Sequence, residues 1–408
     1  MTTRSQSFEC ESIARATTGH QKLGASTILS VLAGLTLCIF LVWGIDLAHG
    51  NRLIICLRDV PRHPDNHLPR VSVIVPARNE QRKIKEALQS LLRLDYPDLE
   101  FIVLNDRSTD QTGAILVEMA AEDPRLQIVN VTELPEGWLG KNYALYCGAQ
   151  KANGELLLFT DADVVMEPST LAIAVSYLQT HRLQHLAIMP RVSLPTLLPR
   201  LFCSAFGIFF SGFMRPWKAK DPASKSFIGI GAFNLLTAEA YRGAGTHTVI
   251  AMRPDDDIKL GKILKKAGYR QEMVLGRGLV TVEWYSSLGE LIEGLMKNTF
   301  AGIDYSVAKS VGAGVAVLLL NVWPFVAIFV VRGLAWVLYM LAVILMLLFI
   351  SDANHLYGLP RRYAFGHPLS SVLFVYILWK STLRTLWTGG IRWRGTHYPL
   401  ELLKANRV

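Results

Sequence analysis

Two aspartates separated by one residue are the clearest chemical feature of the sequence. Asp161 and Asp163 end the apolar run LLLFTDAD at residues 156–163. Such a run predicts a buried strand whose carboxyl end presents both side chains on one side. Close carboxylates repel each other unless a cation lies between them, and Mg²⁺ or Mn²⁺ binds carboxylate oxygens together with substrate phosphates. The pair therefore predicts a divalent metal site for a nucleotide diphosphate; the alternative is a strand end that enters an Asx turn.

A second acidic cluster, DDD at residues 255–257, begins an amphipathic helical pattern over residues 258–267. Acids at a helix start interact favourably with the helix dipole, which is a purely structural explanation for the triplet. A glycine-rich turn, GIGA at residues 229–232, precedes it and is followed by Phe233. Backbone without side chains could approach a ligand closely at this turn.

Alternating strand and helix patterns surround the first aspartate pair and would position it. They predict a parallel sheet with helices on both faces, and such sheets bind ligands at the carboxyl ends of their strands. Polar residues follow the first, second and fourth strands, so three polar strand ends should meet on one rim. The expected strands are residues 71–77, 99–104, 126–131 and 156–159, and the expected helices are residues 80–94, 109–121 and 141–152.

Composition points to a membrane protein. Hydrophobic residues make up 51% of the 408 residues, and the mean hydropathy is +0.28, both high for a soluble chain. The net charge of +9 suits anionic lipid headgroups, and because no basic-aromatic module is present we expect no nucleic-acid partner. The five cysteines form no CxxC motif, which is typical of reduced or buried thiols.

The N-terminal part predicts a membrane anchor. Residues 1–22 are expected to form a polar tail, residues 23–48 a transmembrane helix, and residues 49–70 a linker. About 20 apolar residues suffice to span a bilayer. Arginines dominate the charges that follow the helix, which places residues 71–300 in the cytoplasm as a soluble domain.

The C-terminal part contains further apolar segments. Residues 311–350 predict two transmembrane helices, whereas residues 369–387 contain Lys380 and are expected either to span or to lie re-entrant at the surface. A third span would put the basic tail, residues 388–408, outside the cytoplasm, so we favour two spans. Residues 194–217 are interrupted by prolines and predict a helix at the bilayer interface, with a buried core segment as the alternative.

Five motifs in this order resemble the membrane-anchored family 2 glycosyltransferases with the GT-A fold, including ceramide-, hopanoid- and carotenoid-associated members. The resemblance covers most of the chain, and it implies an α/β, Rossmann-like nucleotide-diphospho-sugar transferase domain with N- and C-terminal transmembrane helices. The motifs are VIVPARNE (73–80), NDRSTDQT (105–112), GWLGKNYAL (137–145), TDAD (160–163) and DDDIKLGKILKKAGYR (255–270).

The resemblance also implies roles for individual residues. Asp257 corresponds to the general base that takes the proton of the acceptor hydroxyl, and Asp163 with Asp161 corresponds to the metal site that holds the donor diphosphate. The donor-binding residues implied in this way are Pro76, Ala77, Arg78, Glu80, Asn105, Asp106, Lys141 and Asp161, and the acceptor-side residues are Gly231, Ala232, Phe233 and Asp256.

The implied activity is an inverting, metal-dependent transfer of one sugar, from a nucleotide-sugar such as a UDP-sugar to a lipid at the cytoplasmic face of the cell membrane. Asn105 stands where the family often has aspartate, which leaves the nucleotide base open. The Q-x-x-R-W motif of processive members is absent, since residues 295–300 read LMKNTF. The tail at residues 391–398 resembles a segment that packs near the site. Two alternatives remain, a processive polysaccharide synthase and a non-catalytic membrane protein that binds nucleotide-sugars.

Overall fold

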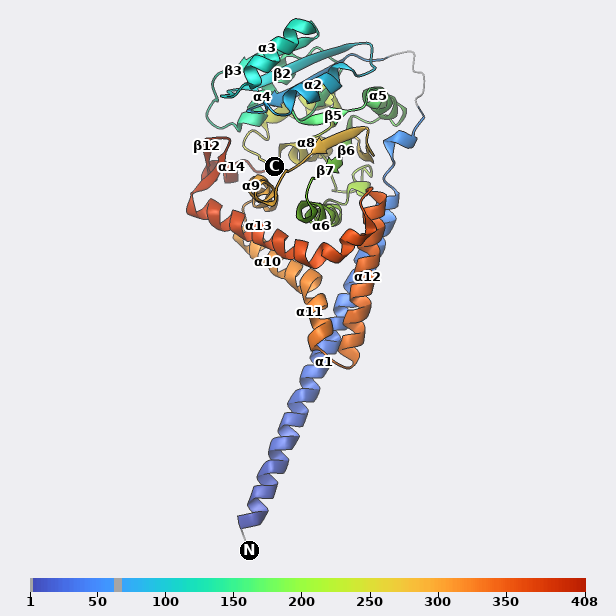
Figure 1. Cartoon of the computed structure of the whole chain (residues 1–408), viewed down its shortest axis with the longest axis vertical. Coiled ribbons are helices and arrows are strands. Elements are labelled where there is room, and N and C mark those ends of the chain that lie inside the picture. The colour runs from blue at the N-terminus through green and yellow to red at the C-terminus, as the bar shows by residue number, and fades with distance from the viewer. Residues whose placement is uncertain (1–2, 62–67) are drawn as a thin grey trace.

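The computed structural model describes the backbone of residues 3–61 and 68–408, and the side chains of residues 26–61 and 68–408. An α/β domain forms one end of the molecule, and a group of helices extends away from it (Figure 1). The long helix α1 (Thr3–Arg52) leads from the N-terminal end up to the domain. Residues 1–2 of the predicted polar tail lie outside the described residues, and the helix begins at Thr3, earlier than the predicted anchor.

A seven-stranded sheet forms the centre of the α/β domain. Its order is β3-β2-β1-β4-β8-β6-β9, and β8 alone among these strands runs antiparallel to its neighbours. The first, third and fourth strands have the predicted bounds, and apolar residues make up most of each. The strands are β1 (Val71–Ala77), β2 (Leu99–Asp106), β3 (Leu126–Val131), β4 (Leu156–Phe159), β6 (His185–Met189), β8 (Asn234–Thr237) and β9 (Gln271–Leu275).

Helices cover both faces of this sheet, as predicted. Alternation along β1 sends Val73 and Val75 into the core beneath α2, α3 and α5, and sends Ile74 into the core beneath α4, α7 and α8. Burial on both faces fixes the register, and the strand ends therefore meet on one rim. The helices are α2 (Ile84–Leu92), α3 (Thr112–Glu122), α4 (Gly140–Lys151), α5 (Thr170–Thr180), α7 (Ala238–Gly243) and α8 (Asp256–Lys266).

A smaller sheet lies beside the rim and was not predicted. It is formed by β5 (Val164–Met166), β10 (Val280–Glu283) and β7 (Arg191–Ser193), with β10 in the centre. The strand β5 begins directly after Asp163, so this sheet fixes the chain on the far side of the aspartate pair. The helix α9 (Leu288–Thr299) follows β10.

Several helices are long and apolar enough to cross a membrane by length and composition. Among the described residues these are Ser26–Arg52, Leu197–Lys218, Val307–Val330 and Leu334–Leu356. The third combines α10 (Val307–Val317), a π-helical turn (Leu318–Val322) and α11 (Trp323–Val330), and α12 (Leu334–Leu356) then packs along α1. Large apolar side chains such as Phe329, which is 84% exposed, cover the outside of this group. A lipid environment accounts for such a surface.

Two apolar helices lie across the base of the α/β domain (Figure 1). These are α6 (Leu197–Met214), within the predicted interfacial segment, and α13 (His367–Trp387), which begins two residues before the predicted third segment and ends with it. They pack against each other and run at a steep angle to α1 and α12. After α13 the chain returns to the domain as the hairpin β11 (Gly390–Trp393) and β12 (Thr396–Pro399), followed by α14 (Leu400–Ala405).

Candidate functional site

One cavity of about 2030 Å³ opens at the carboxyl ends of β1, β2 and β4. Parallel pairing brings these three strand ends together, as the sequence predicted. All predicted site residues line this cavity except Asn105 and Phe233; they are Pro76, Ala77, Arg78, Glu80, Asp106, Lys141, Asp161, Asp163, Gly231, Ala232, Asp256 and Asp257.

Asn105 and Phe233 do not line this cavity. The Asn105 Nδ2 donates to Asn130 Oδ1 of the neighbouring strand at 2.9 Å, because alternation along β2 directs residue 106 to the cavity in its place. The Phe233 ring is fully buried in the core. Its backbone carbonyl accepts from Ile188 N of the inner strand β6 at 3.2 Å.

Charged side chains crowd the β2 end of the cavity. The buried Asp106 accepts two hydrogen bonds from Arg107, at 2.7 and 3.2 Å, and the Arg78 guanidinium lies 3.6 Å away. Gly140 fits beneath them because a Cβ there would lie 2.6 Å from both Arg107 Nη2 and Asp106 Oδ2. The start of α4 can therefore approach this cluster only through a glycine.

Lys141 joins the two acidic clusters that are far apart in the sequence. Its Nζ lies 2.8 Å from Asp161 Oδ1 and 3.3 Å from Asp256 Oδ2. Burial alone would raise the pKa of Asp161, but the Lys141 charge and hydrogen bond bring that pKa below its usual value. The same carboxylates raise the pKa of Lys141 against the effect of its burial. Lys141 therefore stays an ammonium ion between them.

Asp163 lies in a surplus of negative charge. Burial, followed by the Asp161 and Glu80 carboxylates, raises the pKa of Asp163 to about 7. A hard divalent cation binds carboxylate oxygens and would remove the repulsion between these carboxylates. Among residues 26–61 and 68–408 no group of three or more His, Cys, Asp or Glu side chains converges on one point. The Asp161 and Asp163 pair fits a metal that takes its other ligands from water or a bound phosphate.

Asp257 is held against the glycine-rich turn. Its Oδ2 accepts from Gly231 N at 2.7 Å, and its Oδ1 accepts from Ile258 N at 2.8 Å. Burial and the adjacent Asp256 raise its pKa to about 7. A Cβ on Gly261 of α8 would lie 1.7 Å from the Ile228 carbonyl oxygen, so the helix and the turn touch through backbone. The glycine-rich turn and Asp257 therefore lie in direct contact.

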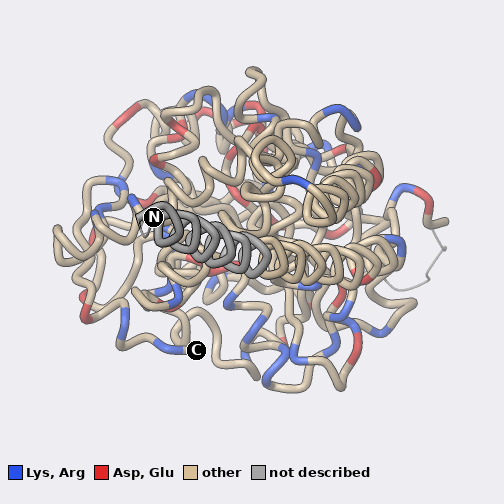
Figure 2. The backbone as a smooth tube through the Cα atoms, turned by 90° about the horizontal axis from the view of Figure 1, so that it is seen from below, with Lys and Arg blue, Asp and Glu red and all other residues tan. Residues whose placement is uncertain are grey.

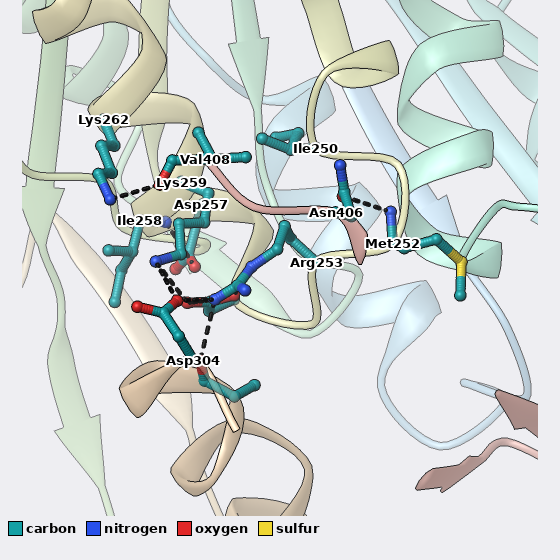
Figure 3. Close-up of polar contacts among 12 residues, drawn as sticks. Ile250, Met252, Arg253, Asp257, Ile258, Lys259, Lys262, Asp304, Asn406 and Val408 are labelled. Carbon is teal, nitrogen blue, oxygen red and sulfur yellow. Dashed lines mark hydrogen bonds and ion pairs between the residues drawn. The ribbon is translucent and has the colours of Figure 1, made fainter. Parts of the chain in front are cut away.

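The three aspartates of the DDD run thus have different surroundings. Asp255 accepts from Arg253 at 2.9 and 3.0 Å, and the fully buried Arg253 also reaches Asp304 at 3.4 Å (Figure 3). This network is structural, since it ties the start of α8 to the segment after α9. Asp256 faces Lys141, and Asp257 alone is directed to the turn.

The C-terminal hairpin completes the cavity, as the resemblance implied for the tail. Arg394 pairs with Glu80 at 2.5 Å, and Tyr398 Oη accepts from Gly140 N at 3.3 Å. Lys297 of α9 lies 3.9 Å above the Trp393 ring. Burial and the nearby Lys141 lower the pKa of Lys297 to about 8. Sequence reasoning did not assign Lys297 or Arg394 to the site, because only the fold brings them there.

The last residues of the chain also pack close to α8 (Figure 3). Asn406 Oδ1 accepts from Met252 N at 3.0 Å, and its Nδ2 donates to the Val249 carbonyl at 2.9 Å. Lys262 Nζ donates to the Val408 carbonyl at 2.5 Å. The C-terminus therefore packs against the α/β domain beside α8.

Below Asp257 the cavity continues between the apolar helices. Rings of α6 line it at helical spacing, where Phe206 stacks with Phe202 and Phe210, and Phe209 contacts Phe374 of α13. Side chains of α1 and α10 form further parts of this wall. The cavity thus joins a charged end and an apolar end.

Comparisons with known proteins agree with this architecture. Residues 72–195 match the model of the family Glycosyl transferase family 2. The probable glycosyltransferase YdaM of Bacillus subtilis is 38% identical over 30% of this chain, but the match spans only 29% of that protein. The 4,4'-diaponeurosporenoate glycosyltransferase of Staphylococcus aureus is 24% identical over 81% of this chain and 88% of its own length.

A solved structure shows the same fold. The mannosyltransferase PcManGT from Pyrobaculum calidifontis, in complex with GDP-Man and Mn²⁺, superposes with a TM-score of 0.53 at 20% identity. The similarity covers 88% of this chain and 99% of the mannosyltransferase. The predicted α/β fold of the GT-A type is therefore confirmed.

Proposed function

We propose that this chain transfers one sugar from a nucleotide-sugar to a lipid acceptor, because residues 72–195 match the model of Glycosyl transferase family 2 and the chain has a GT-A type of fold. The observation that carries the proposal is that one cavity is lined by the carboxylates Asp161 and Asp163, by Asp257 and by the apolar side chains of the helices. A nucleotide-sugar and a lipid would then meet at Asp257.

The charged end of the cavity suits the donor. Arg78 and Arg107 surround Asp106 beside the space for a nucleotide, and Lys141 and Lys297 provide ammonium groups for a diphosphate. Asp161 and Asp163 would hold Mg²⁺ or Mn²⁺, which supplies positive charge for the departing nucleoside diphosphate when bound. Binding there would also relieve the repulsion that raises the pKa of Asp163. We propose a UDP-sugar as donor, to be tested against GDP-sugars.

Asp257 suits the role of general base. Two backbone N–H groups fix its orientation, and a pKa of about 7 lies near the working pH, where a base is most effective. Its free lone pairs would accept the proton of an acceptor hydroxyl. The hydroxyl oxygen would attack the anomeric carbon from the face opposite the diphosphate, which inverts the configuration.

The apolar end of the cavity supports the proposal of a lipid acceptor. Its walls are apolar and aromatic, and a relative is named for an apolar carotenoid acid, 4,4'-diaponeurosporenoate. We infer that a lipid enters between α6, α10 and α13 and presents its hydroxyl to Asp257. Ceramide, diacylglycerol, hopanoid, carotenoid and polyprenyl phosphate remain the acceptor candidates.

We further propose a multi-pass protein of the cell membrane with its catalytic domain in the cytoplasm. The N-terminal helix, the α10–α11 segment and α12 would span, while α6 and α13 would lie at the surface. Viewed from the α1 end, Lys and Arg recur around the outline of the domain (Figure 2), which suits contact with anionic headgroups.

The experiment is transfer of labelled sugar by membranes that contain the full chain, with the glycolipid identified by mass spectrometry. We expect a lipid carrying one sugar, and loss of about 10²- to 10⁴-fold in Asp257→Asn, the usual range for a general base. Asp98→Asn, on an exposed side chain far from the cavity, is the control. Full activity in Asp257→Asn would refute the base assignment, and chains of many sugars would favour a processive synthase.

A further inference from the structure

A group of polar side chains interrupts the apolar part of the cavity, at the level where α6 meets the ends of α1 and α12. We call it the amide cluster. Four of its members line the same cavity as Asp257, and the fifth contacts them from α1. The members are Ser204 and Ser211 of α6, Asn354 of α12, Tyr357 directly after α12, and Asn51 of α1.

The hydrogen bonds of this cluster satisfy the asparagine oxygens only. Ser204 Oγ donates to Asn354 Oδ1 at 2.7 Å, and Tyr357 Oη donates to Asn51 Oδ1 at 3.1 Å. Ser211 Oγ lies 3.1 Å from Tyr357 Oη. The Nδ2 atoms of Asn354 and Asn51 are buried and have no partner, although the two residues are only 2% and 3% exposed.

A purely structural network leaves these two donors unexplained. Holding α1, α6 and α12 together requires the bonds to the carboxamide oxygens, and an unpaired buried amide N–H only reduces stability. Hydrocarbon cannot accept a hydrogen bond, so an entirely apolar lipid chain would leave the Asn354 amide unpaired as well. A lipid that pairs with Asn354 Nδ2 must carry a hydrogen-bond acceptor, such as an oxygen, into the apolar part of the cavity.

We propose that the amide cluster binds a carbonyl oxygen of the acceptor lipid, with Asn354 Nδ2 as the donor. This inference rests on the proposed function and narrows its acceptor class. The acceptor would carry two oxygens with separate tasks, a hydroxyl that reacts beside Asp257 and an ester, amide or carboxyl carbonyl that Asn354 holds among the helices. Acceptors that carry a hydroxyl group but no carbonyl group bind more weakly than acceptors that carry both.

The test compares two probes that differ only in the carbonyl groups. The full chain in mild detergent is titrated with 1,2-dioleoylglycerol and with the corresponding dioleyl ether, and the apparent Kd is measured from the shift in Tm. A single hydrogen bond corresponds to a preference of about threefold to tenfold for the diester. Equal binding of the two probes by the wild type, including no binding of either, would overturn the proposal.

Variants separate ligand binding from packing. Asn354→Leu should lose the diester preference, whereas Ser204→Ala removes the bond to Oδ1 but leaves the amide donor and should retain the preference. Loss of the preference in both variants alike would indicate a packing effect and contradict the proposal. If Asn354→Leu does not fold, the wild-type comparison alone decides.

The same titration distinguishes this inference from the proposed function. Asp257→Asn should still prefer the diester while its sugar transfer falls by about 10²- to 10⁴-fold. A diester preference in a wild-type protein that transfers no sugar from any nucleotide-sugar would refute the glycosyltransferase proposal and leave a carbonyl-binding lipid site. Transfer to the diester and the diether with equal KM would refute the carbonyl site and leave the glycosyltransferase.

Discussion

Because Gly261 contacts the glycine-rich turn, we expect Gly261→Ala to reduce activity strongly while lowering Tm only slightly. In an ordinary helix interior this substitution stabilises by about 1 kcal/mol. Here the new Cβ would lie 1.7 Å from the Ile228 carbonyl oxygen and 3.2 Å from Gly229 N. The obstacle is backbone, so no side chain can rotate away. The turn or the helix must move until the contact reaches at least 3.0 Å, a shift of about 1.3 Å.

The expected cost to folding is small because two effects oppose each other. Overpacking costs about 1 to 3 kcal/mol, and the helical gain offsets about 1 kcal/mol of it. We therefore expect Tm to fall by a few degrees at most. The effect on catalysis should be far larger, because the shift breaks the Gly231 contact that orients Asp257, and a 1 Å misplacement costs about 10²-fold in rate.

The assay is sugar transfer by membranes, together with Tm of the purified chain in detergent. Gly312→Ala is the matched control, because Gly312 also lies inside a helix, α10, but a Cβ there meets nothing within 4 Å. That variant should keep full activity and lose no stability. Wild-type activity in Gly261→Ala would show that the contact between helix and turn does not position Asp257.

Further predictions concern pH and the C-terminal hairpin. Burial alone would raise the pKa of Glu100, but hydrogen bonds from Ser72 and its other neighbours lower that pKa overall. The ionised Glu100 carboxylate therefore stabilises the folded state above about pH 4.3, the pKa of an unperturbed glutamate. This stabilisation is lost as the pH falls further. Tm should fall more steeply in the wild type than in Glu100→Gln between about pH 5 and pH 3. As the proposed general base, Asp257 would have to be deprotonated, so kcat/KM should fall about tenfold per pH unit below about pH 7, and a flat profile would argue against this base. Arg394→Ala removes the ion pair with Glu80 and should raise the KM for the donor several-fold, with partial recovery in Arg394→Lys; an unchanged KM would place the hairpin outside the donor site.

The sequence was sufficient for those parts of the fold that local pattern determines. The strands at residues 71–77 and 126–131 have the predicted bounds, because apolar residues and turn residues mark their ends. β8 was missed, since its four residues, NLLT, are too short for any periodicity. The small sheet of β5, β7 and β10 was missed for the same reason, as its strands have three or four residues.

The site residues that follow consecutive strands of the sheet were predictable from the sequence. The site residues that come from distant C-terminal segments were not. Asp161, Asp163 and Asp257 line one cavity as expected. Phe233 was expected on the acceptor side beside the glycine-rich turn, and its ring lies in the core. Lys297 and Trp393 meet nearly a hundred residues apart, and no local pattern encodes such a contact.

The path of α13 explains why an apolar helix at residues 367–387 contains Lys380 and Arg384. Both side chains reach Glu293 of α9, at 3.5 and 2.7 Å, so the charges face the domain and their cost in an apolar environment is reduced. A helix that crossed the bilayer at this point would carry the hairpin to the opposite side. Arg394 could then not reach Glu80, and the end of the chain could not pack beside α8. The C-terminal segment completes the charged end of the cavity, so the tail and the α/β domain should lie on the same side of the membrane. This favours an even number of spans between the domain and the tail.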